Sequence, residues 1–383
     1  MRISLVTETF PPEINGVAMT NHRLTRSLAE RGHTVELVRP RPVAGDFTVE
    51  GLNAPELLVR GWPVPGYPGL RLGHFARARL AKHWARNRPD VVHIATEGPL
   101  GTAALLAARR LGIPVSSTFH TNFHAYCRHY GAPFLRNAML KYLRWFHNRC
   151  DVTLVPTQQL LNQLQEQGFE RLQRLGRGVD RDLFHPDRRR TELRQSWACR
   201  EDTPVALSVG RIAREKNLRL VIESFQCARE ICPDLRLVFV GDGPLLPRLR
   251  RRFPDACYAG MRVGPDLAAH YASADLFLFP SVTETFGNVV LEALASGLVV
   301  LSYDYAAAHQ FLRHEQNGFL VPYDRSDLFK AGARQLMERR ASWPAWSAAA
   351  RAATVEAPWR AVADVFEQAL VACQSLATAA ACR

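Results

Sequence analysis

The sequence predicts an α/β protein built from two doubly wound parallel sheets, and the alternation of its apolar segments is the main reason. Short apolar runs typical of buried strands alternate with longer segments of helical period in both halves of the chain. Its 383 residues also exceed what one hydrophobic core usually supports. Alternation of this kind favours parallel strands joined by right-handed crossovers. The expected strands lie at 2–6, 34–38, 91–94, 115–119, 152–155, 205–209, 235–240, 276–279 and 299–301.

We expect three parts in the chain. The first domain covers residues 1–185, and the second covers residues 186–355. The stretch 178–204 is rich in Asp, Arg and Pro and is expected to link the two domains. A last helix and a tail of small residues fill 356–383.

The most informative local pattern places two carboxylates around the start of a helix. An apolar strand at 276–279 is followed by Glu284 and then by a helical segment from 288 that contains Glu292. A helix start is a site for anions, and its free N–H groups belong to Phe286, Gly287 and Asn288. We interpret Glu284 as the acceptor of hydrogen bonds from a sugar and Glu292 as a contact of a ribose. The alternative is an ordinary helix with one Glu near its start and another on its surface.

A second pattern delivers cations to the end of a strand. The strand at 205–209 is followed by a loop that holds Arg211 and Lys216. Ligands of open parallel sheets sit at the carboxyl ends of the strands, so both cations can reach a diphosphate there. Taken singly, each could instead be a solvated charge on a loop.

Together these segments resemble the retaining family-4 glycosyltransferases, which have the GT-B architecture of two Rossmann-like domains facing across a cleft. The resemblance covers residues 1–325, and several separate motifs agree in order and spacing. Within the family, the chain looks most like the branch that glycosylates diacylglycerol-type lipids, with its mannosyl-, glucosyl- and sulfoquinovosyltransferases. The motifs lie at 7–12, 15–17, 118–121, 176–180, 183–186, 210–212, 215–217, 240–244 and 284–292.

The resemblance implies roles for residues of the second domain. Arg211 and Lys216 would bind the donor diphosphate, Glu284 would contact the donor sugar, and Glu292 would take the ribose.

The resemblance also implies roles in the first domain. Gly16 would lie close to the transferred sugar and the β-phosphate, and His120 would lie at the reaction centre. Glu8 is a weaker candidate for the acceptor side. For His120 the alternative is a core histidine with satisfied hydrogen bonds. By the same resemblance, the helix at 359–373 would cross back to the first domain.

The implied activity is transfer of a hexose from a GDP- or UDP-linked sugar to a membrane glycerolipid, such as diacylglycerol or a glycosyl-diacylglycerol. A polysaccharide or lipopolysaccharide acceptor and a GT-B sugar-nucleotide epimerase are the alternatives, beside a noncatalytic lipid-surface protein. Asp180-Arg181-Asp182 matches the D-x-D pattern of metal-dependent glycosyltransferases. Because Arg211, Lys216 and a helix start can offset the diphosphate charge, we predict a metal-independent enzyme without a cofactor.

The chain departs from the family pattern in two loops. The usual double glycine of the first loop is Asn15-Gly16, which still leaves one glycine for close approach. The loop at 303–308 carries tyrosines and alanines where many relatives carry glycines and an acidic residue. We expect this second change to affect the acceptor or domain closure more than donor binding.

Basic charge is concentrated in the first domain. The chain has a net charge of +13, and residues 51–150 contain fourteen Arg or Lys against three acids. The partner should therefore be anionic. Residues 134–149 form an amphipathic helical pattern with a basic face, which is either packed on the core or drawn to an anionic membrane surface. Nucleic acid is a poor candidate because no recognition motif accompanies the charge.

Cysteine usage and hydropathy indicate where the protein works. The eight cysteines contain no C-x-x-C pair, and the first residues start a strand and lack a signal-peptide pattern. No apolar run approaches 18 residues. We expect a cytoplasmic protein, peripheral at the inner face of the cell membrane.

Overall fold

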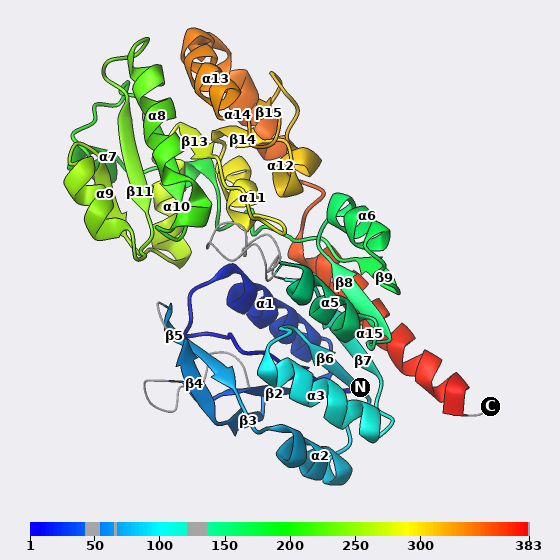
Figure 1. The fold of residues 1–383 in the computed structure, drawn as a ribbon. Helices are drawn as coiled ribbons and strands as arrows, with labels where there is room; N and C mark the ends of the chain where they lie inside the picture. Colours follow the sequence, from blue (N-terminus) through cyan, green and yellow to red (C-terminus); the bar gives the residue numbers. More distant parts are fainter. Residues whose placement is uncertain (43–53, 65–66, 121–135, 382–383) are drawn as a thin grey trace. The chain divides into compact units, whose positions relative to one another are not determined.

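The computed structural model describes residues 1–42, 54–64, 67–120 and 136–381. They form two compact units (Figure 1). The first unit comprises Met1–Arg177 with Trp359–Arg383, and the second comprises Gly178–Pro358. The sequence places the boundaries after residues 185 and 355, whereas in the structure 178–185 and 356–358 belong to the second unit.

The first unit is built on a parallel sheet with the order β3-β2-β1-β6-β7-β8-β9. A separate antiparallel hairpin pairs β4 (Gly61–Val64) with β5 (Tyr67–Gly73). The hairpin, β3 and β9 were not predicted, because these strands are short or only partly buried and lack a continuous apolar run. The sheet strands are β1 (Arg2–Val6), β2 (Thr34–Pro40), β3 (Glu56–Val59), β6 (Val91–Ile94), β7 (Val115–Thr118), β8 (Val152–Val155) and β9 (Leu172–Arg174).

Helices cover both faces of this sheet. On one face, α2 (Arg77–Arg86) and α3 (Pro99–Arg110) pack against a cluster that contains Val6. On the other face, α1 (Gly16–Glu30) and α15 (Trp359–Ala381) pack against Leu5. Consecutive strand residues thus face opposite layers. A third cluster joins α5 (Arg136–His147) and α6 (Gln158–Glu166).

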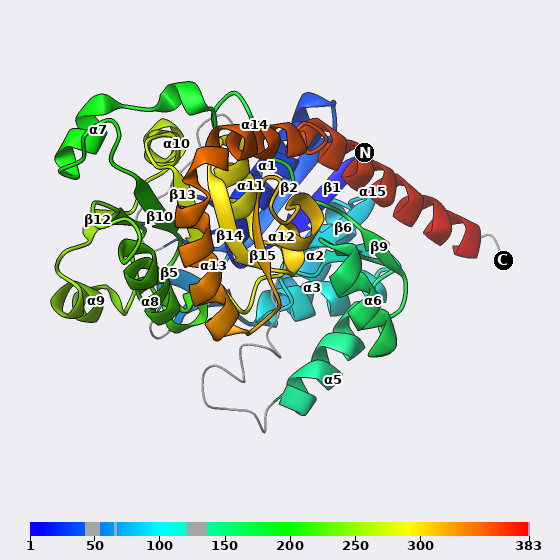
Figure 2. The same cartoon turned by 90° about the horizontal axis from the view of Figure 1, so that it is seen from above.

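The last helix is part of the first unit. Phe366 of α15 meets the His93 ring edge-on at 4.8 Å between ring centres. Arg31 pairs with Asp364 and Glu367 of the same helix, each at 2.6 Å. Figures 1 and 2 show α15 running past α1 toward the carboxyl terminus. Residues at the two ends of the chain therefore build one core.

The second unit has a parallel sheet with the order β12-β11-β10-β13-β14-β15. The prediction of two doubly wound sheets is therefore confirmed, although the edge strands β12 and β15 were not predicted. The strands are β10 (Val205–Val209), β11 (Arg236–Val240), β12 (Cys257–Gly260), β13 (Leu276–Phe279), β14 (Val299–Tyr303) and β15 (Gly318–Val321). The helices are α7 (Thr191–Ser196), α8 (Leu218–Arg229), α9 (Leu246–Arg252), α10 (Gly264–Ala272), α11 (Asn288–Ala295), α12 (Ala306–Phe311), α13 (Ser326–Glu338) and α14 (Trp343–Ala353).

Helices again cover both faces of the sheet. A cluster with α8, α9 and α13 packs on Leu237 and Phe239, and a cluster with α10, α11 and α14 packs on Val238 and Val240. Helices α8 and α13 lie side by side in Figures 1 and 2, and both contribute to the first of these clusters.

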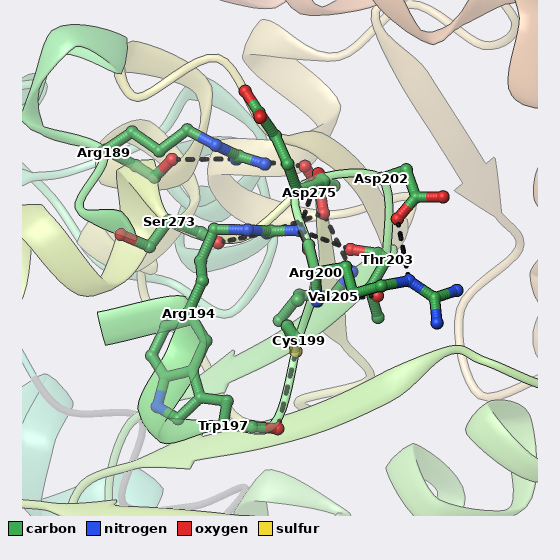
Figure 3. Close-up of polar contacts among 12 residues, drawn as sticks. Arg189, Arg194, Trp197, Cys199, Arg200, Asp202, Thr203, Val205, Ser273 and Asp275 are labelled. Atoms are coloured by element: carbon green, nitrogen blue, oxygen red, sulfur yellow. Dashed lines mark hydrogen bonds and ion pairs between the residues drawn. The ribbon is translucent and has the colours of Figure 1, made fainter. Parts of the chain in front are cut away.

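The segment expected to link the domains is tied to the second unit. Arg194 of α7 is buried and donates to the carbonyl of Ser273 at 2.8 Å and to Asp275 at 3.4 Å. Asp275 also accepts the Val205 N–H at 2.8 Å and pairs with Arg189 at 3.1 Å (Figure 3). This network lies at the amino ends of β10 and β13, the edge opposite to the candidate site.

Each sheet reverses its strand order once. In the first unit the reversal lies between β1 and β6, and in the second it lies between β10 and β13. Ligands of open α/β sheets bind outside the carboxyl ends of the strands at such points. The loops after these four strands are therefore where a site is expected.

Candidate functional site

Lys216 and Glu284 lie at the centre of the candidate site in the second unit. Lys216 ends a short 3₁₀ helix, η3 (Arg214–Lys216), after β10, and Glu284 follows β13. The Lys216 ammonium donates to Glu284 Oε1, and the Ser281 hydroxyl donates to the same oxygen at 2.6 Å. The Lys216 nitrogen also lies 5.6 Å from the ring centre of Phe279, within cation–π range. The two loops of the strand reversal thus meet through one ion pair.

Glu284 is ionised at neutral pH. Burial opposes ionisation of its carboxyl, but the charge and hydrogen bond of Lys216 and the hydrogen bond of Ser281 outweigh burial, so the pKa of Glu284 lies below its usual value. An ionised carboxylate can only accept hydrogen bonds. Glu284 is therefore suited to bind hydroxyl groups.

Arg211 lies beside this pair. Its guanidinium is 3.5 Å from the carboxylate of Glu215, which is buried. Both cations predicted from the sequence line the same pocket at the carboxyl end of β10. The pocket is lined by Ser208, Val209, Gly210, Arg211, Ile212, Lys216, Leu218, Phe279 and Pro280.

Two glycines let the loop after β11 pack against the loop after β10. Gly241 has φ +135°, and a Cβ there would lie 2.0 Å from the carbonyl oxygen of Gly210. At Gly243 a Cβ would lie 2.6 Å from the carbonyl oxygen of Ile212. The glycines at 241 and 243 thus pack against the loop that carries Arg211, which explains the motif at 240–244.

The start of α11 follows Glu284 directly. Gly287 has φ +89° and precedes the first residue of the helix, Asn288; this left-handed conformation favours glycine. The ring of Phe286 is buried and meets Phe311 edge-on, so Phe286 offers a ligand only its backbone. The first N–H groups of a helix have no intrahelical acceptor and can bind an anion.

Glu292 is held by a buried tyrosine. The hydroxyl of Tyr271, in α10, donates to Glu292 Oε2 at 3.0 Å. Burial and the Glu292 charge raise the pKa of Tyr271 well above its usual value, so the hydroxyl stays a donor. Tyr271 was not predicted, because it reaches Glu292 only after two helices pack together.

Tyr305 contacts the loop that carries Glu284. Its hydroxyl accepts the Glu284 N–H at 3.1 Å and donates to the carbonyl of Ser281 at 2.7 Å. The loop at 303–308 therefore braces the Glu284 loop, because β13 and β14 are neighbours. Whether the loop affects the acceptor or domain closure more than donor binding stays a prediction, but the sheet brings it next to Glu284 although the two are distant in sequence.

The first unit places the other candidates at its own strand ends. Gly16 is the first residue of α1, and the preceding Asn15 caps the helix by accepting the Ala18 N–H at 2.9 Å. Asn15, which replaces the usual first glycine of this loop, thus caps the helix, while Gly16 remains exposed.

His120 lies in a buried polar network after β7. Arg177 donates to His120 Nδ1 at 3.2 Å, and His93 contacts the Thr118 hydroxyl at 3.2 Å. Burial, with the Arg177 charge, holds the pKa of His120 well below its usual value and lowers that of His93 to about 3. Both imidazoles are neutral at pH 7. Since Nδ1 of His120 accepts a hydrogen bond, its proton resides on Nε2.

Glu8 and Glu97 lie at the strand reversal of the first unit. Glu8 accepts the Leu100 N–H at 2.9 Å and the Thr96 hydroxyl at 2.8 Å, so both its oxygens have donors. Burial raises the pKa of Glu8 to about 7 and that of Glu97 to about 8. Glu97 was not predicted, although its place just after the strand at 91–94 was a usable signal. The hydroxyl of Tyr142 donates to the Glu97 carbonyl.

The D-x-D segment forms a turn. Asp180 accepts the Leu183 N–H at 3.0 Å. Among the described residues, no group of three or more His, Cys, Asp or Glu side chains could hold a metal ion.

Helix α5 partly decides between the two interpretations of the amphipathic segment, a helix packed on the core and a helix at a membrane surface. Leu143 and Phe146 are fully buried, and Met139 packs against the core, whereas Lys141 and Arg144 are exposed. The apolar side of the helix thus packs against the core of the first unit. Residues 134 and 135 of the predicted segment lie outside the described part of the chain. Over the described residues, no helix combines the length and apolar character needed to span a membrane.

Comparison with known proteins identifies the family. Residues 14–183 match the model of Glycosyltransferase Family 4, and residues 203–339 match that of Glycosyl transferases group 1. A GDP-mannose-dependent alpha-mannosyltransferase of Mycobacterium tuberculosis is 33% identical over 95% of this chain and 94% of its own length. The chain belongs to glycosyltransferase family 4. The suspected resemblance is therefore confirmed.

Other relatives lie in the suspected branch. This glycosyltransferase is 31% identical to the sulfoquinovosyl transferase of Arabidopsis thaliana, over 94% of this chain and 71% of that protein. It is 30% identical to the alpha-monoglucosyldiacylglycerol synthase of Acholeplasma laidlawii, over 79% and 81%. The sucrose-phosphate synthase structure from Thermosynechococcus elongatus matches with a TM-score of 0.77 at 18% identity, covering 97% of this chain and 99% of that one. The enzyme thus has the GT-B fold.

Proposed function

We propose that this enzyme transfers a hexose, with retention, from a GDP- or UDP-linked sugar to a hydroxyl of a membrane glycerolipid, such as diacylglycerol or a glycosyl-diacylglycerol. The observation that carries the proposal is the Lys216–Glu284 pair beside Arg211 at the strand reversal of the second sheet. Cations for a diphosphate and a carboxylate for hydroxyls meet there. The names of the relatives support a GDP-mannose donor and a diacylglycerol-type acceptor.

On the donor side, Arg211 and Lys216 bind the diphosphate, and the N–H groups at 286–288 complete its anion site. Negative charge develops on the departing diphosphate, and donors already in place stabilise it without reorganisation. Glu215 keeps the Arg211 side chain beside the pocket. Because these groups offset the charge, the reaction requires no metal ion and no cofactor.

The sugar and the ribose are bound by carboxylates. Glu284 accepts hydrogen bonds from hexose hydroxyls, and Glu292, held by Tyr271, takes the ribose. Gly16 permits close approach of the backbone to the sugar. His120 offers its Nε2–H near the reacting carbon. No enzyme carboxylate is assigned as a nucleophile. Retention of configuration follows from membership of the family, and we assign the attack of the acceptor hydroxyl to the face of the leaving group.

The experiment is transfer of labelled sugar to lipid. Purified enzyme is incubated with GDP-, UDP- and ADP-sugars and diacylglycerol, and the lipid product is quantified. Lys216→Ala and Glu284→Ala are expected to abolish transfer while the fold survives, and Lys330→Ala, a surface lysine of the same unit, is expected to be active. Transfer by either site variant at the wild-type rate would reject its assignment. Isomerisation of the donor sugar without acceptor would instead favour an epimerase, and transfer only to a polysaccharide would favour that acceptor.

The enzyme also contacts the membrane peripherally, at its anionic cytoplasmic face. The excess of basic residues over acids at 51–150 supports this, as does the exposed basic side of α5. Changing Lys141 and Arg144 together to Glu is expected to weaken sedimentation with anionic vesicles. Unchanged sedimentation would exclude α5 from the contact.

A further inference from the structure

Three rings form an exposed aromatic patch at the β4–β5 hairpin of the first unit. Trp62 is 59% exposed and Phe75 is 86% exposed. Trp62 stacks on His74 at 4.3 Å between ring centres and meets Phe75 edge-on at 6.0 Å. We call Trp62, His74 and Phe75 the aromatic patch. Its two largest apolar side chains remain largely in solvent although each has an aromatic neighbour.

The patch is presented by a firmly held segment. Arg71 of β5 donates twice to the carbonyl of Gly61, at 3.1 and 2.7 Å. Gly73 packs so closely that a Cβ there would lie 2.8 Å from Leu100. Phe75 has φ +49°, a conformation that is unfavourable for a bulky residue. Because the ring is largely exposed, packing within the described part of the chain offsets little of this strain. The geometry therefore points to a partner.

Exposed arginines flank the aromatic patch. The side chains of Arg60, Arg77 and Arg79 are exposed, and none pairs with an acidic side chain in the described part of the chain. The acid nearest to Arg60 in the sequence, Glu56, is engaged by Arg39 at 3.0 Å. The acid nearest to Arg77 and Arg79, Asp90, accepts the Arg2 N–H at 2.7 Å. Positive charge at this hairpin is therefore available to an external anionic partner.

We propose that the aromatic patch and these arginines dock the enzyme on an anionic lipid surface. Aromatic rings with a polar edge favour the boundary between headgroups and acyl chains, and arginine stems lie along apolar surface while their heads reach phosphates. The inference deepens the proposed function and rests on it for the lipid acceptor. It assigns insertion to the hairpin, whereas α5, whose apolar side is buried, adds only charge.

The test is partitioning onto vesicles that contain phosphatidylglycerol, measured by sedimentation. Trp62→Ala with Phe75→Ala is expected to lower the partition coefficient at least about tenfold. The matched control is Ile231→Ala with Val355→Ala, two exposed apolar residues of the second unit, which should bind as wild type. Equal partitioning of the patch variant and wild type would overturn the proposal.

A second variant separates binding from folding. Phe75→Gly removes the ring and suits the positive φ, so it should melt no lower than wild type yet partition less. Wild-type partitioning by Phe75→Gly together with the double variant would contradict the proposal. Replacing Arg60, Arg77 and Arg79 with Gln should weaken binding to anionic vesicles and leave binding to phosphatidylcholine vesicles unchanged.

Further measurements separate this inference from the proposed function and from another partner. The patch variant should still glycosylate detergent-dispersed acceptor, because neither Trp62 nor Phe75 is among the residues proposed to bind the donor or to take part in transfer. If wild type binds vesicles through the patch but transfers sugar to no lipid, the docking surface stands and the proposed function fails. If the patch variant loses affinity for a single-stranded oligonucleotide and none for vesicles, the surface binds nucleic acid and the proposal is wrong.

Discussion

Arg177 fixes the protonation state and the tautomer of His120. Its guanidinium donates to His120 Nδ1 and to the carbonyls of Leu175 and Gly176, each of these last two at 3.0 Å. Its own pKa is lowered to about 10 by burial, which still leaves it charged at neutral pH. The charge disfavours an imidazolium at His120, and the hydrogen bond selects the Nε2–H tautomer.

Replacing Arg177 tests that positioning role. Arg177→Leu is expected to lower kcat about 100-fold, because the imidazole loses its orienting donor. Arg177→Gln, whose amide can still donate, should retain more activity. Affinity for GDP should stay at the wild-type value, since Arg177 is not among the residues proposed to bind the diphosphate. A drop in GDP affinity equal to the drop in kcat would indicate loss of folding and contradict the role.

Glu97 makes stability depend on pH. Its pKa is raised by burial from 4.5 to about 8, so the unfolded chain releases this proton at lower pH than the folded one. The folded state therefore loses stability as pH rises from the unfolded pKa toward 8, by up to about 1.4 kcal/mol per pH unit. Glu97→Gln should become progressively more stable than wild type across this window in urea denaturation.

The control for Glu97 is an exposed glutamate. Glu30 has a side chain that is 65% exposed, so Glu30→Gln should follow wild type at every pH. A stability difference between Glu97→Gln and wild type that does not change with pH would show that Glu97 is not held protonated.

At the scale of elements, the first turn of α3 illustrates a cap built from distant residues. Glu8, after β1, accepts the Leu100 N–H and thereby caps α3. A Cβ at Gly98 would lie 2.3 Å from Glu8 Oε2. Only glycine leaves room for the carboxylate, so the cap depends on a pair of residues separated by many positions in the sequence.

Gly98→Ala should therefore destabilise the first unit. The methyl group displaces the Glu8 carboxylate and leaves a buried charge or N–H without a partner, at a cost of about 1–3 kcal/mol. The expected readout is a lower melting temperature. Gly112→Ala is not a suitable control because its φ is positive; Gly176→Ala, where a Cβ meets nothing within 4 Å, is. Equal melting of Gly98→Ala and wild type would contradict the capping role of Glu8.

The interior strands could be predicted from the sequence, and the edge strands could not. Strand β13 is a continuous apolar run and β10 is apolar except for Ser208, because helices bury both of their faces. The edge strand β12 is only half buried, and β9 has one apolar residue in three, so neither gives a strong signal. The hairpin β4–β5 lies outside both sheets.

The residues of the candidate site likewise divide into those that the sequence predicted and those that it did not. Lys216, Glu284 and the start of α11 lie in short motifs, so their spacing in sequence predicted them. Tyr271, Tyr305 and Arg177 reach the site only through packing between elements, and no local pattern identifies such contacts. Whether Glu8 acts on the acceptor side stays a prediction, because its two oxygens already serve the helix cap.

At the scale of the whole molecule, the two units divide the chemistry. The second unit carries the residues proposed to bind the donor, around the β10–β13 reversal, and the first carries His120, the Glu8–Glu97 pair and most of the excess positive charge. Helix α15 ties the end of the chain to the first unit, so the second unit is an insertion between two parts of one core. On the proposed function, transfer uses residues of both units, whereas most of the proposed contacts to the nucleoside diphosphate belong to the second.

The proposed donor site is tested most directly by calorimetric titration of GDP and UDP into wild type and Lys216→Ala, with Lys330→Ala as the matched control. Loss of a charged hydrogen bond to the diphosphate should weaken the preferred nucleotide about 10- to 100-fold in Lys216→Ala. Lys330→Ala should bind as wild type. If Lys216→Ala binds the diphosphate with wild-type affinity, the donor does not lie at the β10–β13 reversal.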